Sequence, residues 1–290
     1  MAAKTHDDVD WTSRLPLMRR ADRLDAETHA GVAARLTAGL PPSPTVVDVG
    51  CGSGGMSASF AAALAAAGGG TLVLVDGTEA LLAEAESVST RAGGGSVQVK
   101  AVHADLGGQD LRALVPEADL VWASAVVHHL PDQQAGINRL VTALRTGGTL
   151  ALAEGGLPTQ HLPADLGVGE PGLERRLLAA KEIWFWEMRG GMEGSVRMPY
   201  GWETALGKAG LADVSSFGVL YHHPAPGGEA VRAAAIDAIT WLAQGAEERL
   251  SASDNAALAQ LLDPESPHYL GARDDLSLLA ARTVHFGRMP

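Results

Sequence analysis

One short segment combines the residue types that a nucleotide-like ligand requires. From Val46 to Gly55 an apolar strand runs into a glycine-rich turn and then into the start of a helix. Gly50, Gly52 and Gly54 allow positive φ angles and let a ligand lie against the backbone. The helix that follows presents N–H groups at its N-terminus. This segment therefore predicts a binding loop at the end of a strand.

Two classes of ligand fit these glycines. Gly50, Gly52 and Gly55 satisfy the dinucleotide pattern G-x-G-x-x-G, and Asp76 follows at a distance suited to a ribose hydroxyl. Asp48 weighs the other way, because a carboxylate two residues before the glycines would repel a pyrophosphate. A zwitterionic amino-acid group suits it better. Asp48 therefore favours a ligand that carries an amino-acid group, and a nicotinamide dinucleotide remains the alternative.

The sequence of the glycine-rich segment is typical of one protein family. Val-Val-Asp-Val-Gly-Cys-Gly-Ser-Gly, residues 46–54, closely resembles motif I of the class I S-adenosylmethionine-dependent methyltransferases, and the similarity extends over about residues 40–154. The resemblance implies an α/β fold, a doubly wound Rossmann-like seven-stranded sheet with a helical cap. It implies S-adenosylmethionine as cofactor and S-adenosylhomocysteine as product. The cofactor-binding residues that it implies are Asp48, Gly50, Cys51, Gly52, Ser53, Gly54, Asp76, Gly77, Asp105, Leu106, Ser124 and, from the preceding helix, Arg14.

Within that set, the resemblance implies that several residues contact different parts of the cofactor. Asp76, at the end of the second strand, would hold both ribose hydroxyls. Asp105 and Leu106, after the third strand, would meet the adenine, although Asp105 also suits a turn or a helix cap. Ser124, at the end of the fourth strand, would lie under the methionine portion.

Histidines follow the predicted fourth strand. Val126–Asp132 is similar to the Leu-His-His-Leu-Pro segment of many small-molecule methyltransferases, which lies at the mouth where the acceptor enters. A histidine there can act as general base because its ordinary pKa is near neutrality. Either His128 or His129 could serve, and Glu154 and His222 are further catalytic candidates. The alternative is that one histidine packs under a helix and the other is merely exposed.

Aromatic residues cluster where an acceptor would need cover. Five of the thirteen aromatic residues lie between positions 184 and 202, in a chain otherwise poor in them. Aromatic and thioether side chains suit a flat apolar acceptor, although helix packing explains any single one equally well. The predicted acceptor-binding residues are Trp11, Met18, Trp184, Trp186, Met188, Arg197, Tyr200 and Tyr221.

The elements that must position these residues follow an alternating pattern. Short apolar strands are expected at 45–49, 71–75, 97–103, 118–124 and 149–153, with helices between them, which predicts a parallel sheet covered on both faces. Residues 155–172 read as a loop, and further strands are expected at 214–221 and 276–286. The predicted organisation is an N-terminal helical lid (1–40), a cofactor-binding core (41–154), a helical substrate cap (155–200) and the rest of the core sheet (201–290). A helical insertion is expected at about 226–263.

The amino-acid composition limits the kinds of partner that the protein is expected to bind. A net charge of −12 with only four lysines argues against nucleic acid, which needs a basic face. No apolar run approaches the length of a membrane span, and the polar N-terminal residues do not resemble a secretory signal. A single cysteine, Cys51, excludes an intramolecular disulfide, and a metal is not expected. These features predict a cytoplasmic enzyme, monomer or homodimer, with a small-molecule partner.

The predicted reaction is methyl transfer to a small metabolite, aromatic or derived from an amino acid, in specialised metabolism. Oxygen, nitrogen and carbon acceptors all stay open. The alternatives are an NAD(P)-dependent oxidoreductase that uses the same glycine loop, and a non-catalytic protein that keeps the fold for binding.

Overall fold

Helices and a single sheet alternate along the chain as the apolar pattern predicts. The computed structural model describes residues 10–244 and 246–290. Its strands are β1 (Thr45–Val49), β2 (Gly70–Asp76), β3 (Val97–His103), β4 (Ala118–Ser124), β5 (Leu144–Gln160), β6 (Ala212–His223) and β7 (Leu278–Arg288). Its α-helices are α1 (Trp11–Thr37), α2 (Gly55–Ala66), α3 (Glu79–Gly93), α4 (Leu111–Leu114), α5 (Gln133–Val141), α6 (Leu173–Gly191), α7 (Trp202–Lys208), α8 (Gly228–Ala243) and α9 (Ala252–Leu262).

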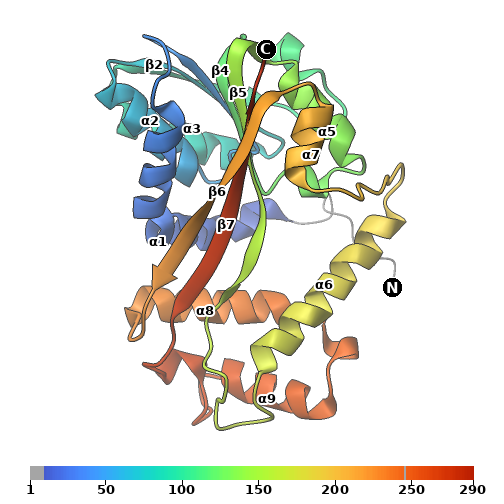
Figure 1. Cartoon of the computed structure of the whole chain (residues 1–290). Coiled ribbons are helices and arrows are strands. Elements are labelled where there is room, and N and C mark those ends of the chain that lie inside the picture. The colour runs from blue at the N-terminus through green and yellow to red at the C-terminus, as the bar shows by residue number, and fades with distance from the viewer. Residues whose placement is uncertain (1–9, 245) are drawn as a thin grey trace. The chain divides into compact units, whose positions relative to one another are not determined.

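The strands form one seven-stranded sheet in the order β3-β2-β1-β4-β5-β7-β6 (Figure 1). β1 pairs in parallel with both β2 and β4, β2 with β3, and β4 with β5. Met289, just after β7, exchanges backbone hydrogen bonds with Gly147 and Gly148 near the beginning of β5, so β7 runs antiparallel to its neighbour. The predicted doubly wound, Rossmann-like α/β fold is confirmed.

Helices cover both faces because successive strand residues point to opposite sides. Val46, Leu72 and Leu120 pack with side chains of α1, α2 and α3, among them the fully buried Phe60. Their chain neighbours Val47, Val73 and Val121 pack with α4, α5 and α7. Continuous apolar strands such as β1 and β4 therefore fill two cores at once.

Polar side chains set where several helices begin. Asp10 accepts a hydrogen bond from the backbone N–H of Ser13 at the start of α1, and Asp132 accepts one from Ala135 at the start of α5. Each of these caps satisfies a backbone donor that the helix itself leaves unpaired. The β4–α5 connection is thereby held at a fixed length, and it carries the two histidines singled out above.

Two predicted boundaries are corrected by the structure. Residues 155–160, predicted as loop from their Gly and Pro content, continue strand β5. Gly155 and Gly156 have positive φ angles, which are more typical of turns, yet both lie within the strand. Pairing with neighbouring strands therefore outweighs their local preference for a turn. The helical insertion expected at about 226–263 consists of two helices, α8 and α9, and α9 begins at its own cap, Ser251.

The chain divides into two compact units. The core unit comprises, of the described residues, 10–156, Glu193–Val219 and Arg282–Pro290, and the second unit comprises Leu157–Met192 and Leu220–Ala281. The second unit has its own apolar core, built from α6, α8 and α9 around side chains such as Leu177, Ile239 and Leu261. The predicted cap and the predicted helical insertion thus belong to one unit, and residues 193–200 belong to the core unit. In the part of the chain that the structure describes, no helix has the length and apolar character to cross a membrane.

Candidate active site

The glycine-rich turn lies at the carboxyl ends of β1 and β2. The backbone N–H groups of Gly50 and Cys51 both donate to the carbonyl oxygen of Val75, at distances of 2.7 and 3.1 Å. Gly50, Gly52 and Gly54 all have positive φ angles. The turn is therefore fixed to the end of the sheet, where ligands of open α/β folds bind.

Neighbouring elements also pack closely against these glycines. A Cβ atom on Gly54 would lie 2.5 Å from the Cα atom of Ala85 in α3, and one on Gly50 would collide with Val126. A Cβ on Gly52 would lie 2.8 Å from Cε of Met18. The backbone thus meets α3, the histidine segment and α1 at three neighbouring points. Met18, predicted to contact the acceptor, lies directly over the loop.

Three carboxylates converge on this turn. Asp76 accepts hydrogen bonds from the backbone N–H groups of Gly52 (2.9 Å) and Thr78 (2.8 Å). Asp48 is buried and accepts a hydrogen bond from the Ser57 hydroxyl at 2.5 Å. Burial raises the pKa of Asp48 to about 7, the carboxylates of Asp76 and Asp22 add to the rise, and the Ser57 hydroxyl opposes it. The site is therefore suited to a ligand that brings positive charge.

The third carboxylate, Asp22 of α1, was not foreseen. It accepts a hydrogen bond from the Ser53 hydroxyl at 2.5 Å and one from the backbone N–H of Gly55. Gly55 is the first residue of α2, so Asp22 occupies the anion position at that helix N-terminus. A pyrophosphate would have to displace this carboxylate and would then face Asp48 and Asp76 as well. The arrangement disfavours the dinucleotide alternative. The spacing of Asp22 one helical turn after Met18 is the signal that could have identified it.

Helix α1 is held over the turn by a further pair. Arg19 forms a two-pronged ion pair with Glu84 of α3, with its Nε atom 2.9 Å from Oε1. Met18, Arg19 and Asp22 of α1 thus all reach toward the loop or its neighbour α3. Arg14, predicted to reach the cofactor, lies about one turn closer to the beginning of α1 than Met18, with its guanidinium 5.9 Å from the ring centre of Trp11. Burial lowers the pKa of Arg14.

The other predicted cofactor residues lie at the same edge of the sheet. Cys51 is buried, and burial raises the pKa of its thiol. The Gly77 carbonyl lies 2.9 Å from Nε2 of His103. Asp105 accepts a hydrogen bond from the backbone N–H of Gly107, the turn role weighed as its alternative, and Leu106 packs against the core. Ser124 ends β4 and is exposed.

The histidine segment is organised by Glu154. This residue of β5 is 2% exposed, and its Oε1 atom accepts hydrogen bonds from the backbone N–H groups of Val126 (2.9 Å) and Val127 (2.7 Å). Its Oε2 atom lies 2.6 Å from Nδ1 of His128. A carboxylate at Nδ1 favours the tautomer with its proton there, so that Nε2 is the nitrogen able to accept a proton. Two predicted catalytic residues are thus brought together.

Two further histidines lie close to this pair, and a third, His222, belongs to the other unit. The ring of His129 lies next to that of His128, with centroids 3.7 Å apart. His285 of β7, not foreseen, is buried, with Nε2 3.1 Å from the Glu154 carbonyl oxygen and Nδ1 3.0 Å from the Glu203 carboxylate. His222 is exposed on β6 and belongs to the second unit, as does its half-buried neighbour Tyr221.

The predicted acceptor residues divide between the two units. In the core unit the Tyr200 hydroxyl donates to the side chain of Gln134 at 3.1 Å, and Arg197 is exposed. In the second unit Trp186 is 61% exposed, whereas Met188 is buried. The ammonium group of Lys181 lies 4.0 Å from the ring centre of Trp184.

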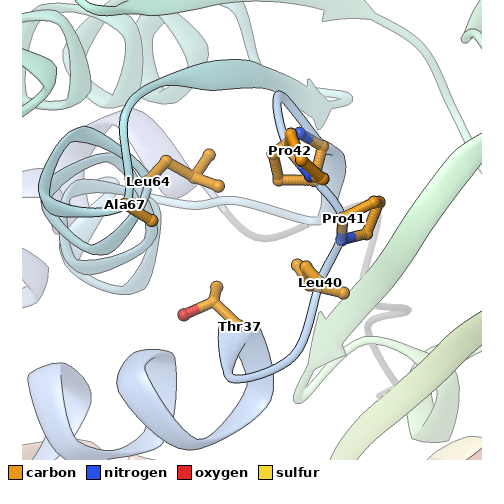
Figure 2. Close-up of a pocket in the computed structure, with 7 residues that line it drawn as sticks. Thr37, Leu40, Pro41, Pro42, Leu64 and Ala67 are labelled. Atoms are coloured by element: carbon orange, nitrogen blue, oxygen red, sulfur yellow. The ribbon is translucent and has the colours of Figure 1, made fainter.

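A pocket of about 220 Å³ lies elsewhere on the core unit (Figure 2). Its walls are Thr37, Leu40, Pro41, Pro42, Pro44, Leu64 and Ala67. Pro44 directly precedes β1, so the pocket is at the amino end of that strand. The glycine turn and the histidine segment lie at the carboxyl ends of the strands. The pocket is therefore at the opposite edge of the sheet and is not part of the candidate site.

Comparison with known proteins agrees with the geometry. A family model described as "Methyltransferase domain" matches residues 47–150, from the middle of β1 to β5. The trans-aconitate 2-methyltransferase of Deinococcus radiodurans is 28% identical over 248 residues, which cover 82% of this chain and 83% of the relative. A Bacillus halodurans protein assigned as a methyltransferase shares the fold, with 16% identity, a TM-score of 0.51, and coverage of 90% of this chain and 98% of that one. The chain is therefore similar to methyltransferases in its central core, from β1 to β5, and over most of its length to one methyltransferase, in agreement with the motif.

Proposed function

We propose that the protein transfers the methyl group of S-adenosylmethionine to a small-molecule acceptor whose proton is removed by His128. The observation that carries the proposal is the 2.6 Å contact between Nδ1 of His128 and the buried carboxylate of Glu154. A buried carboxylate that orients an imidazole is the arrangement by which histidine bases are held in one tautomer and one position.

The donor set fits this cofactor. When bound, S-adenosylmethionine supplies an electrophilic methyl group on a sulfonium. Asp76 has two carboxylate oxygens at the end of β2 to hold the ribose hydroxyls, and Asp48 provides negative charge for the ammonium group. The backbone around Gly50, Cys51, Gly52, Ser53, Gly54 and Gly77 would line the ligand, with Leu106 and Asp105 toward the adenine and Ser124 toward the methionine portion.

The chain's own residues would perform three tasks in the reaction. Glu154 holds the histidine segment through Val126 and Val127 and so fixes where the His128 ring lies. The Nε2 atom of His128 takes the proton from the acceptor as the methyl group moves. Met18, over the loop, helps exclude water, which strengthens the electrostatic effects of the site.

For the acceptor we propose a small metabolite with an aromatic or amino-acid-derived skeleton, made in specialised metabolism. The clustering of aromatic residues at positions 184–202 supports this, because aromatic side chains suit a flat ring. Trp11, Trp184, Arg197, Tyr200 and Tyr221 stay candidates for contacts with it, and Arg14 for the cofactor. Met188 is not carried over, because its side chain is buried.

The test is methyl transfer from labelled donor to a metabolite extract, followed by pH–rate profiles on the acceptor that it identifies. His128→Ala is expected to lower kcat by about 10²–10³-fold, the range of a general base, and to leave donor binding within twofold. His129→Ala is the matched control and should keep most of the activity. Equal turnover of wild type and His128→Ala at saturating acceptor would remove the base from the proposal.

A second acceptor class is favoured by one comparison. The relative from Deinococcus radiodurans is named for trans-aconitate, a small carboxylic acid. A carboxylate is already ionised at neutral pH and needs no base, so a carboxylate-methylating enzyme would tolerate His128→Ala far better. An ester product together with a small His128→Ala effect would select this second class.

A further inference from the structure

Asp22 takes part in hydrogen bonds that do not require a charged group. It receives one hydrogen bond from the Ser53 hydroxyl and one from the backbone N–H of Gly55. An asparagine oxygen can accept one of these bonds while its amide donates to the Ser53 hydroxyl, so a neutral residue can bridge the same two groups. The helix dipole favours a negative charge at this position only modestly, so capping α2 explains an oxygen here and only part of the preference for a carboxylate.

That charge is costly where it lies. Burial raises the pKa of Asp22, the Ser53 hydroxyl and the Gly55 N–H oppose the rise, Glu84 adds to it, and Arg23 opposes it. The nearby cation Arg19 is already paired with Glu84. Asp22 and Asp76 both add to the raised pKa of Asp48, and Asp76 accepts a hydrogen bond from Gly52 of the same turn. Three like charges close together disfavour one another unless a cation joins them.

The cofactor proposed above supplies such a cation, and its product does not. S-adenosylmethionine carries a sulfonium, an ammonium and a carboxylate, a net charge of +1. S-adenosylhomocysteine has lost the sulfonium charge together with the methyl group and is neutral overall. A site with an extra carboxylate therefore attracts the donor more than the product, and more strongly in a site that is only partly hydrated.

We propose that Asp22 is a selectivity residue of the cofactor site, whose carboxylate, with those of Asp48 and Asp76, favours the sulfonium donor over the uncharged product. This inference rests on the proposed function, since it takes the glycine turn as the cofactor loop. Its consequence is easier product release: once the methyl group has left, the attraction that held the ligand weakens.

The experiment is calorimetric titration of three ligands into wild type, Asp22→Asn and Glu27→Gln. The ligands are S-adenosylmethionine, S-adenosylhomocysteine and sinefungin, which has an ammonium-bearing carbon in place of the sulfonium. Asp22→Asn keeps the shape and one acceptor oxygen, and its amide group can donate to the Ser53 hydroxyl. Glu27→Gln removes the same charge from an exposed position of the same helix and is the matched control.

For Asp22→Asn we expect the Kd of the two cationic ligands to rise about five- to tenfold and that of the product to change less than twofold. Glu27→Gln should leave all three within twofold. An equal change for all three ligands, or no change for any, would overturn the inference. Wild type that binds none of them would instead contradict the proposed function. Asp22→Ser is the second neutral variant if Asp22→Asn does not fold.

Discussion

A single buried carboxylate, that of Asp48, makes the stability of the fold depend on pH. Asp48 is 2% exposed and has Ser57 as its hydrogen-bonding partner, and burial raises its pKa from 3.8 to about 7. Its ionisation is therefore easier in the unfolded chain than in the folded protein. A group of this kind stabilises the fold fully below the unfolded pKa, and the contribution is lost as pH rises through the folded pKa.

We expect the free energy of unfolding of the ligand-free protein to fall between about pH 4 and pH 7 because of Asp48. A shift of that size corresponds to about 4 kcal/mol, as an order of magnitude. Asp48→Asn keeps a partner for Ser57 and removes the ionisation, so urea unfolding at pH 5 and pH 8 should give more similar stabilities for the variant than for wild type. The same pH dependence in both proteins would show that Asp48 does not cause it.

Glu154 supports a second prediction at this scale. Its carboxylate accepts from two backbone N–H groups and from His128, so Glu154→Gln replaces one acceptor oxygen by a donor amide. We expect kcat to fall about 10–100-fold, with donor affinity within twofold, because the imidazole loses its orientation. Glu203→Gln, on the partly exposed side of His285, is the control and should change kcat less. An effect of Glu203→Gln as large as that of Glu154→Gln would contradict a specific role for the carboxylate.

At the scale of elements, the glycine turn depends on close approach between helices. Gly54 has a φ angle of 89°, and a Cβ atom there would lie 2.5 Å from a backbone atom of α3, which cannot rotate away. Gly94, at the end of α3, also has a positive φ angle, 56°, but nothing lies within 4 Å of its Cβ position. A substitution at Gly94 therefore tests backbone strain alone, whereas one at Gly54 tests backbone strain together with close packing.

We expect Gly94→Ala to cost about 1 kcal/mol, the strain of a left-handed alanine, and Gly54→Ala to cost more than about 3 kcal/mol because helices α2 and α3 must also move apart. Chemical denaturation of both variants is the measurement. Similar losses would mean that the contact between α2 and α3 relaxes easily.

At the scale of the whole molecule, the two units have separate apolar cores. Leu177 of α6 and Leu74 of β2 are both fully buried, the first in the second unit and the second in the core unit. Leucine-to-alanine changes at such positions cost about 2–5 kcal/mol in the unit that contains them.

We therefore expect Leu177→Ala to leave the Kd of S-adenosylhomocysteine within twofold at 20 °C, because the glycine turn, the proposed cofactor loop, belongs to the core unit. Leu74→Ala, in a strand next to β1, should weaken this binding or lower the ligand-induced rise in Tm. Equal effects of the two variants on cofactor binding would contradict the independence of the two cores.

Much of the fold was accessible from the sequence because it depends on local pattern. Apolar runs at 45–49 and 118–124 predicted buried parallel strands, and the order of Asp48, the glycines and Asp76 favoured one cofactor over another. The extension of β5 through Gly155 was predicted wrongly as loop. Its residues favour turns locally, and only pairing with neighbouring strands made them a strand.

What the tertiary structure decided is which distant residues meet. The acid before the glycines and the histidine pair could be read from the chain, because both lie within short motifs. Asp22 reaches Ser53 across 31 residues, and Glu154 reaches His128 across 26. Nothing in local propensity links such positions: α1 must fold over the loop, and β5 must lie beside β4. The sequence alone favoured one kind of ligand, whereas packing decided which carboxylates lie at the glycine turn and which carboxylate holds the His128 ring.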